Sequence, residues 1–161
     1  MSRTPITIPF GKSPPAGVVT TLACSVLGYL DGMGSAARFS HPHGIAVNAS
    51  GDVYVADPYN SYTVRKITAA GVVTTLAGST SYGSTDGTGS AAQFLSVHGV
   101  TVDGSDNVYV SDYYSIRRIT STGVVTTLAG AVGSYGSSDG TGSAALFFLP
   151  KFVATLYAPI C

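Results

Sequence analysis

Three copies of one short motif limit what this chain can fold into. The sequence Gly-Val-Val-Thr-Thr-Leu-Ala begins at Gly17, Gly71 and Gly123, so it recurs after 54 and then 52 residues. Self-similarity at a fixed period marks a chain in which one supersecondary unit is stacked on the next. The sequence therefore predicts a repeat array.

Other blocks recur in step with the first one. The block DGMGSAA begins at Asp31, and DGTGSAA begins at Asp86 and at Asp139. The blocks HGIAV and HGVTV begin at His43 and His98, and each is followed by a strand-like run, DVYVAD or NVYVSD. Ordered blocks that keep their spacing indicate about two and a half copies of one unit.

Each full copy contains four short runs rich in Val, Ile, Tyr and Thr, separated by turn residues. This pattern is typical of strands and shows no helical period. Gly and Asp in the connections favour tight turns, so we expect each copy to form an antiparallel meander. Between the two copies we expect a turn at Asp86 and a single helical turn near 90–94. The predicted strands are 44–48, 53–56, 63–68 and 72–77 in the first copy, and 99–102, 108–111, 115–120 and 124–129 in the second.

A four-stranded antiparallel sheet repeated at this period is typical of a β-propeller, so the predicted fold class is all-β, an incomplete propeller. We expect full blades at about 44–78 and 99–130, with lone strands at about 17–23 and 152–156. A Pro-rich irregular lead at 1–16 precedes them, and a tail at 156–161 follows.

A closed propeller has about four to eight blades, more than 161 residues hold at this period. Open blades leave strand edges and apolar faces that invite pairing with another chain. We therefore expect a fragment of a larger propeller, or a chain that self-associates through its open edges.

The repeat resembles the NHL family of propeller repeats. The resemblance rests on 42–47 (PHGIAV), 52–57 (DVYVAD) and 64–67 (VRKI), and on the matching runs of the second copy. It implies blades whose first strand lines a central channel and whose fourth strand faces outward. The family includes protein-binding and RNA-binding propellers as well as enzymes such as the peptide-amidating lyase, so the fold does not choose a function.

Composition narrows the classes of partner. Lys plus Arg and the acidic residues each number eight, so the formal net charge is zero. A neutral chain lacks the basic surface that nucleic acid or anionic membrane requires, and we expect neither as a partner. No segment has the pattern of a signal peptide or the roughly 20 apolar residues of a transmembrane span. Two cysteines do not fix a redox compartment, so the localisation stays open.

The candidate metal ligands are His43 and His98, which occupy equivalent positions at the entry to the predicted channel strands. Two imidazoles from neighbouring blades could begin a zinc or calcium site like that of the lyase relatives. Zinc needs three or four ligands, however, and the third equivalent position is Lys151. We expect a structural or solvent-facing role for both histidines and no bound cofactor.

Four tyrosines fall in the loops between the second and third strands of the two copies: Tyr59, Tyr62, Tyr113 and Tyr114. Loop aromatics are good contact residues, and this rim is the predicted binding surface.

Charged residues are expected to serve the fold. We expect Asp31, Asp86 and Asp139 to form turns. Asp57 and Asp112 are expected to satisfy turn amides or to pair with Arg65 and Arg117, each within its own blade.

The sequence thus predicts a non-enzymatic scaffold that mediates protein or glycan interaction, with no catalytic residue of its own. The alternative is part of an NHL-type lyase or hydrolase with a metal-assisted site in the central channel.

Overall fold

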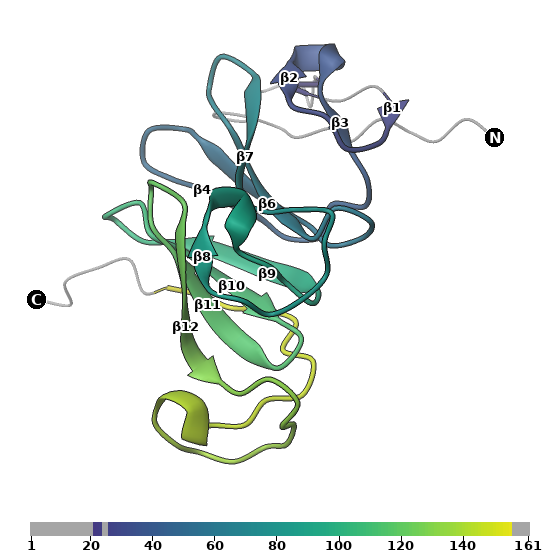
Figure 1. The fold of residues 1–161 in the computed structure, drawn as a ribbon. Helices are drawn as coiled ribbons and strands as arrows, with labels where there is room; N and C mark the ends of the chain where they lie inside the picture. Colours follow the sequence, from purple (N-terminus) through teal and green to yellow (C-terminus); the bar gives the residue numbers. More distant parts are fainter. Residues whose placement is uncertain (1–20, 24–25, 156–161) are drawn as a thin grey trace, which may run out of the picture.

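The computed structural model describes residues 21–23 and 26–155 (Figure 1). Two five-stranded antiparallel sheets follow one another along the chain, and the all-β propeller-blade class is confirmed. The predicted lead at 1–16, most of the strand at 17–23 and the tail at 156–161 lie outside the described residues.

The first sheet has the strand order β2-β7-β6-β5-β4, and the second has the equivalent order β8-β12-β11-β10-β9. The strands of the first sheet are β2 (Gly32–Met33), β4 (Ile45–Val47), β5 (Val53–Asp57), β6 (Thr63–Ile67) and β7 (Val72–Gly78). The second sheet comprises β8 (Gly87–Thr88), β9 (Val97–Val102), β10 (Val108–Asp112), β11 (Ser115–Ile119) and β12 (Val124–Gly130). A two-stranded parallel pair, β1 (Val26–Leu27) and β3 (Arg38–Phe39), precedes the first sheet.

The DGxGSAA block forms a fifth strand on each sheet, which the four-strand prediction did not include. The dipeptide after the first Asp pairs with the outermost long strand of its own copy, β2 with β7 and β8 with β12. A 3-10 turn follows in all three copies, as η1 (Gly34–Ala36), η2 (Gly89–Ala91) and η3 (Gly142–Ala144). The block thus closes the outer edge of each blade.

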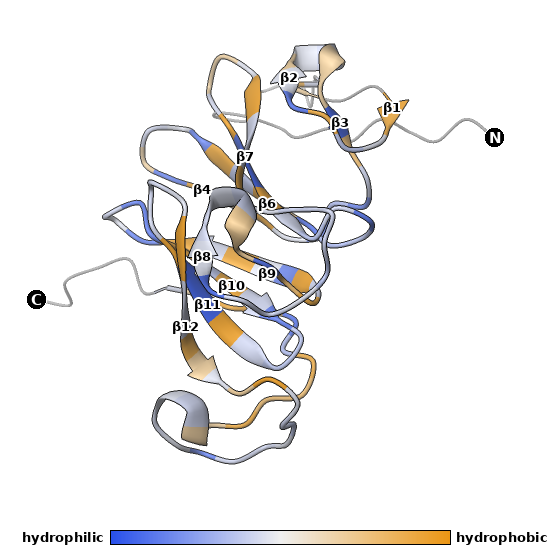
Figure 2. Cartoon of the chain, viewed as in Figure 1, coloured by the Kyte–Doolittle hydropathy of each residue, from blue (hydrophilic) through white to orange (hydrophobic). Residues whose placement is uncertain are grey.

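Apolar side chains gather between the two sheets, where β4 and β5 pack against β9. Figure 2 shows apolar positions along the strands and more hydrophilic connections. Tyr54, Phe94, Val97 and Val108 are fully buried members of this core. At about 25 cal/mol per Å² of buried apolar area, such contacts are the main favourable term that holds one blade on the next.

The inner strands come close where the repeat has glycine. A Cβ added at Gly44 would lie 2.2 Å from the carbonyl oxygen of His98, and one added at Gly99 would lie 2.7 Å from that of Lys151. Glycine is required at both positions because another backbone occupies the space of a side chain. The third equivalent residue is Phe152, whose side chain is 92% exposed.

Residues 151–155 lie beside β9, and the Thr155 hydroxyl reaches Thr101 and the carbonyl of Val102. The described part of the predicted strand at 152–156 is not a regular strand. A regular strand needs a neighbouring strand to pair with. The described residues contain no further strand of the third copy, so residues 152–155 only lie against β9 of the second sheet.

In the part of the chain that the structure describes, no helix is long and apolar enough to span a membrane.

Candidate functional site

Each complete blade is built around one buried arginine. Arg65 on β6 and Arg117 on β11 have no exposed surface and are the largest fully buried side chains. The pairing of each strand with its outer neighbour shifts register just before the arginine, at Val64/Arg65 and at Ile116/Arg117. Such a bulge re-aims a side chain, so the sequence places both guanidinium groups inside the blade.

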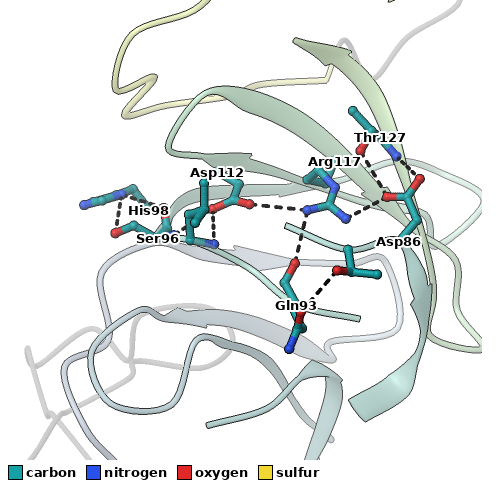
Figure 3. Close-up of polar contacts among 9 residues, drawn as sticks. Asp86, Gln93, Ser96, His98, Asp112, Arg117 and Thr127 are labelled. Carbon is teal, nitrogen blue, oxygen red and sulfur yellow. Dashed lines mark hydrogen bonds and ion pairs between the residues drawn. The ribbon is translucent and has the colours of Figure 1, made fainter. Parts of the chain in front are cut away.

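Arg117 contacts groups from three parts of its blade (Figure 3). Its Nη2 lies 2.7 Å from the Asp86 carboxylate, and its Nη1 lies 3.3 Å from Asp112. Nη1 also donates to the carbonyl of Gln93 at 3.3 Å. The guanidinium lies over the Phe94 ring, 5.3 Å from its centroid. This set of contacts is called the arginine clamp below.

The first blade repeats the clamp. Arg65 pairs with Asp31 at 2.5 Å, donates to the carbonyl of Arg38 at 3.2 Å and lies over the Phe39 ring at 4.9 Å. It also donates to the carbonyl of Leu30 at 3.0 Å. The two blades therefore hold a guanidinium with equivalent groups.

The clamp carboxylates also fix the outer strand. Asp86 accepts hydrogen bonds from the backbone N–H and the hydroxyl of Thr127, at 3.1 and 3.0 Å, and Asp31 accepts the same pair from Thr75. Burial alone would raise the pKa of Asp86, but hydrogen bonds from Thr127 and the Arg117 guanidinium hold it below 3.8. Asp31 and Asp86 thus do more than form turns: they tie the loop to two strands.

The predicted roles of the second pair of acids are found in part. Asp57 accepts the backbone N–H groups of Ser40 and His41 at 2.9 and 2.7 Å. Asp112 accepts those of Leu95 and Ser96, at 2.9 and 2.7 Å, and also pairs with the clamp arginine. Burial is the dominant influence on Asp112 and raises its pKa, although these hydrogen bonds oppose the shift. All these groups hold the blade together.

The predicted tyrosine rim forms a groove. Tyr59, Tyr62 and Tyr113 come together with Tyr82 around a cavity of about 410 Å³. The rest of its lining is Pro58, Leu95, Ser96, His98, Leu149 and Lys151. This set is called the tyrosine groove below. Tyr62 has a φ of +43°, an unusual conformation for a residue of its size.

Tyr114 lies outside the lining of the groove. Its ring meets Tyr113 edge to face at 4.6 Å and stacks with Tyr135 at 6.0 Å, and Tyr135 in turn lies 5.6 Å from Phe148. The sequence analysis did not select Tyr82 and Tyr135. Their signal is a shared context, since each stands in Ser-Tyr-Gly-Ser four residues before the Asp of a DGTGSAA block.

The two candidate metal ligands are in contact. The ring centroids of His43 and His98 lie 5.1 Å apart, and both rings line a second cavity of about 420 Å³ with Lys151 and Phe152. Among residues 21–23 and 26–155 no group of three His, Cys, Asp or Glu side chains is placed to hold a metal ion.

The hydrogen bonds of His98 determine its tautomer. Nδ1 lies 2.9 Å from the carbonyl oxygen of Ser96, which only accepts, so Nδ1 carries the proton. Nε2 then accepts from the Lys151 ammonium at 3.1 Å. Burial lowers the pKa of His98, and the charge of Lys151 lowers it further. A metal ion at this nitrogen has to displace the lysine.

Comparisons with known proteins agree with this architecture. The NHL repeat family matches residues 39–67. No curated protein matches the sequence. A structural genomics protein of unknown function from Bacteroides thetaiotaomicron VPI-5482 is 28% identical with a TM-score of 0.69, and the match covers 88% of this chain and 35% of that one.

A second solved structure shares the fold. An auxiliary nutrient binding protein from the same organism is 22% identical with a TM-score of 0.58, over 68% of this chain and 31% of its own. The chain thus spans about a third of the length of these two structures.

Proposed function

We propose that this chain, an NHL-repeat segment of β-propeller fold, is a non-enzymatic scaffold that binds a protein partner through the tyrosine groove. The observation that carries the proposal is the convergence of tyrosines from two blades on one cavity. Tyrosine supplies a large, rigid contact area with a polar tip and is enriched at protein interfaces.

The framework below the groove supports this role. Tyr59 and Tyr62 follow β5, and Tyr113 follows β10, so each loop leaves a buried strand. Ser61 is fully buried in the first loop and donates to the carbonyl of Asp57 at 2.6 Å. Loops held in this way lose little conformational entropy on binding.

The groove favours a peptide segment over a flat surface. It is lined by ring faces together with one ammonium group, Lys151, and one imidazole, His98. An extended segment that carries an apolar side chain next to a carboxylate would match this lining. A glycan would use the same rings through stacking, and the experiment separates the two.

Selection of a displayed peptide library against the full chain tests the proposal. We expect peptides whose binding perturbs the amide resonances of the groove loops. The Tyr59→Ala/Tyr113→Ala double variant should lose about tenfold or more in affinity, because central aromatic contacts contribute about 2 kcal/mol or more. Met33→Ala, an exposed apolar change on β2, is the control.

A glycan array on the same proteins provides the second arm. If the groove binds glycans and selects no peptide, or if the selected peptides bind the double variant with unchanged affinity, the proposal is wrong.

The metal-assisted lyase or hydrolase remains the alternative because the His43 and His98 rings are in contact. It predicts stoichiometric zinc or calcium in the purified protein, lost in a His43→Ala/His98→Ala variant. If elemental analysis finds no more zinc or calcium in the native protein than in this variant, the two histidines do not form a metal site and the alternative loses its support.

A further inference from the structure

The third copy of the DGxGSAA loop has the backbone geometry of the first two. Its 3-10 turn begins at Gly142 with a φ of +56°, against +54° at Gly34 and +57° at Gly89. The hydrogen bond that closes the loop is also present, from the Leu146 N–H to the carbonyl of Ser138 at 3.0 Å. In the first two copies this geometry accompanies an arginine clamp.

The groups that the DGxGSAA loop contributes to a clamp have counterparts in the third loop. Asp139 stands where Asp31 and Asp86 stand, and the carbonyl of Leu146 corresponds to those of Arg38 and Gln93. Phe147 corresponds to the two phenylalanines that lie under the guanidinium groups. Asp139, Leu146 and Phe147 line one open cavity of about 670 Å³, called the Asp139 pocket below.

The Asp139 pocket holds no guanidinium from the described residues. Among residues 21–23 and 26–155, no ion pair and no hydrogen bond involves the Asp139 carboxylate. Phe147 is only partly buried, whereas Phe39 and Phe94 are 2% and 0% exposed beneath their arginines. The pocket thus has the loop groups of a clamp without the guanidinium that they bind.

We propose that the Asp139 pocket binds the arginine of a β-hairpin of this same repeat type that the described residues do not supply. The inference rests on the proposed scaffold function and names the chemistry of one partner. In both filled clamps the arginine is on one strand, and the threonine that bonds the same carboxylate is on the next. The partner is therefore a hairpin and not a lone side chain.

The chemistry of the pocket selects arginine over lysine. The occupant has to reach a carboxylate and a carbonyl oxygen in different directions while its flat face lies on Phe147. A planar guanidinium with five donors meets all three demands, whereas an ammonium is a compact point charge.

The backbone adds one further contact. Gly34 and Gly89 donate their N–H to the carbonyls of Gly71 and Gly123, at 2.9 Å in both cases. These acceptors lie in the turn of the clamp hairpin. The N–H of Gly142 is the equivalent donor, so an incoming hairpin is bound at its turn as well as at its arginine.

The chain itself supplies the probe. A synthetic peptide of residues 115–130 contains Arg117, Gly123 and Thr127, and a disulfide between added terminal cysteines limits the entropy lost on binding. It is titrated into the isotope-labelled full chain to about 1 mM, a concentration that detects weak binding. We expect resonance shifts in residues 138–147.

Matched variants decide the role of the arginine. We expect a loss of roughly tenfold or more in affinity when the Arg117→Met peptide is added to the native chain. The same loss is expected when the native peptide is added to the Asp139→Asn chain, because both changes remove hydrogen bonds to charged groups. The Arg117→Lys peptide should lose most of its affinity as well. Ser143→Ala, an exposed change on the same loop, should leave binding unchanged.

The inference is wrong if the native peptide does not bind up to about 1 mM, or if Asp139→Asn or Arg117→Met binds equally well. The proposed function is assessed separately, because the Asp139 pocket and the tyrosine groove share no lining residue. If the hairpin peptide does not bind but a peptide selected for the tyrosine groove binds the Asp139→Asn chain with unchanged affinity, the inference is wrong and the proposed function still stands.

Discussion

At the scale of single residues, Arg65 and Arg117 are the largest fully buried side chains among the described residues, and a buried charge costs free energy unless it is paired. The Arg117 Nε atom is buried without a hydrogen-bond partner in the described structure, so the clamp satisfies the guanidinium at its two terminal nitrogens. A buried charge of this kind is tolerated because its partners are fixed, and it becomes a liability when one of them is removed.

Replacing Arg117 should therefore destabilise the second blade strongly. Arg117→Met leaves Asp112 buried without its cation, and breaking a buried pair typically costs about 3–5 kcal/mol. The free energy of unfolding from urea titration measures the effect. Arg118→Met, at the neighbouring exposed position, is the matched control with an expected change of about 0.5 kcal/mol or less. Equal effects of the two variants would mean that the clamp contributes nothing specific.

His98 should titrate below its ordinary pKa of 6.5, since burial and Lys151 both disfavour its charged form. The unfolded chain then takes up a proton at a higher pH than the folded chain does. Stability from this group is present above about pH 6.5 and declines as the pH falls towards the lowered folded pKa.

An NMR titration of the His98 ring, repeated on Lys151→Met, measures this shift. The variant should have a higher His98 pKa than the native chain. An unchanged value would show that the lysine charge does not act on the ring.

At the scale of strands, short runs rich in Val, Ile, Tyr and Thr predicted ranges that overlap the long strands of both blades. Such runs could not predict β2 and β8, which have two residues each and are defined only by pairing with a strand about 40 positions later. The clamps are also long-range, with Asp31 and Arg65 34 residues apart. A strand pattern contains no information on such pairs, although their recurrence in step with the repeat was a usable signal.

The candidate site was predictable to a similar degree. The loop positions of Tyr59, Tyr62 and Tyr113 follow from the repeat, and the groove contains all three. Lys151 beside His98 depends on how the third copy packs on the second, which no local pattern encodes.

The contact between inner strands offers a prediction at this scale. In Gly44→Ala the new Cβ would lie 2.2 Å from the His98 carbonyl oxygen, a backbone atom that cannot move alone. We expect a loss of roughly 1–3 kcal/mol in the free energy of unfolding, as for other overpacked sites.

Gly136→Ala is the control for this change, because its Cβ would meet only the flexible side chain of Leu146 at 3.2 Å. If both variants unfold at the same urea concentration, close approach of the blades does not require glycine.

At the scale of the whole molecule, the described blades form an open array. Leu128 on β12 is 52% exposed, whereas Leu76, its equivalent on β7, packs against the core between the two sheets. Val132 and Phe148, which follow β12 in the sequence, are each 59% exposed. Surfaces of this kind bind other apolar surfaces.

We therefore expect self-association of the purified chain. Light scattering should give a mass above the 16.3 kDa of one chain, rising with concentration. Leu128→Ser should lower the association without unfolding the blades. A stable, folded monomer at every concentration would contradict this expectation.

Phe152 affects which surface of the third copy another sheet can approach. Gly44 and Gly99 admit the backbone of the following sheet where a side chain would otherwise project, and Phe152 puts an aromatic ring at the third equivalent position. A sheet stacked there in the manner of the first two would collide with the Cβ atom. The third inner position therefore differs from the first two, and a sheet that lies against it has to keep a greater distance from the backbone of Phe152 than the first two blades keep.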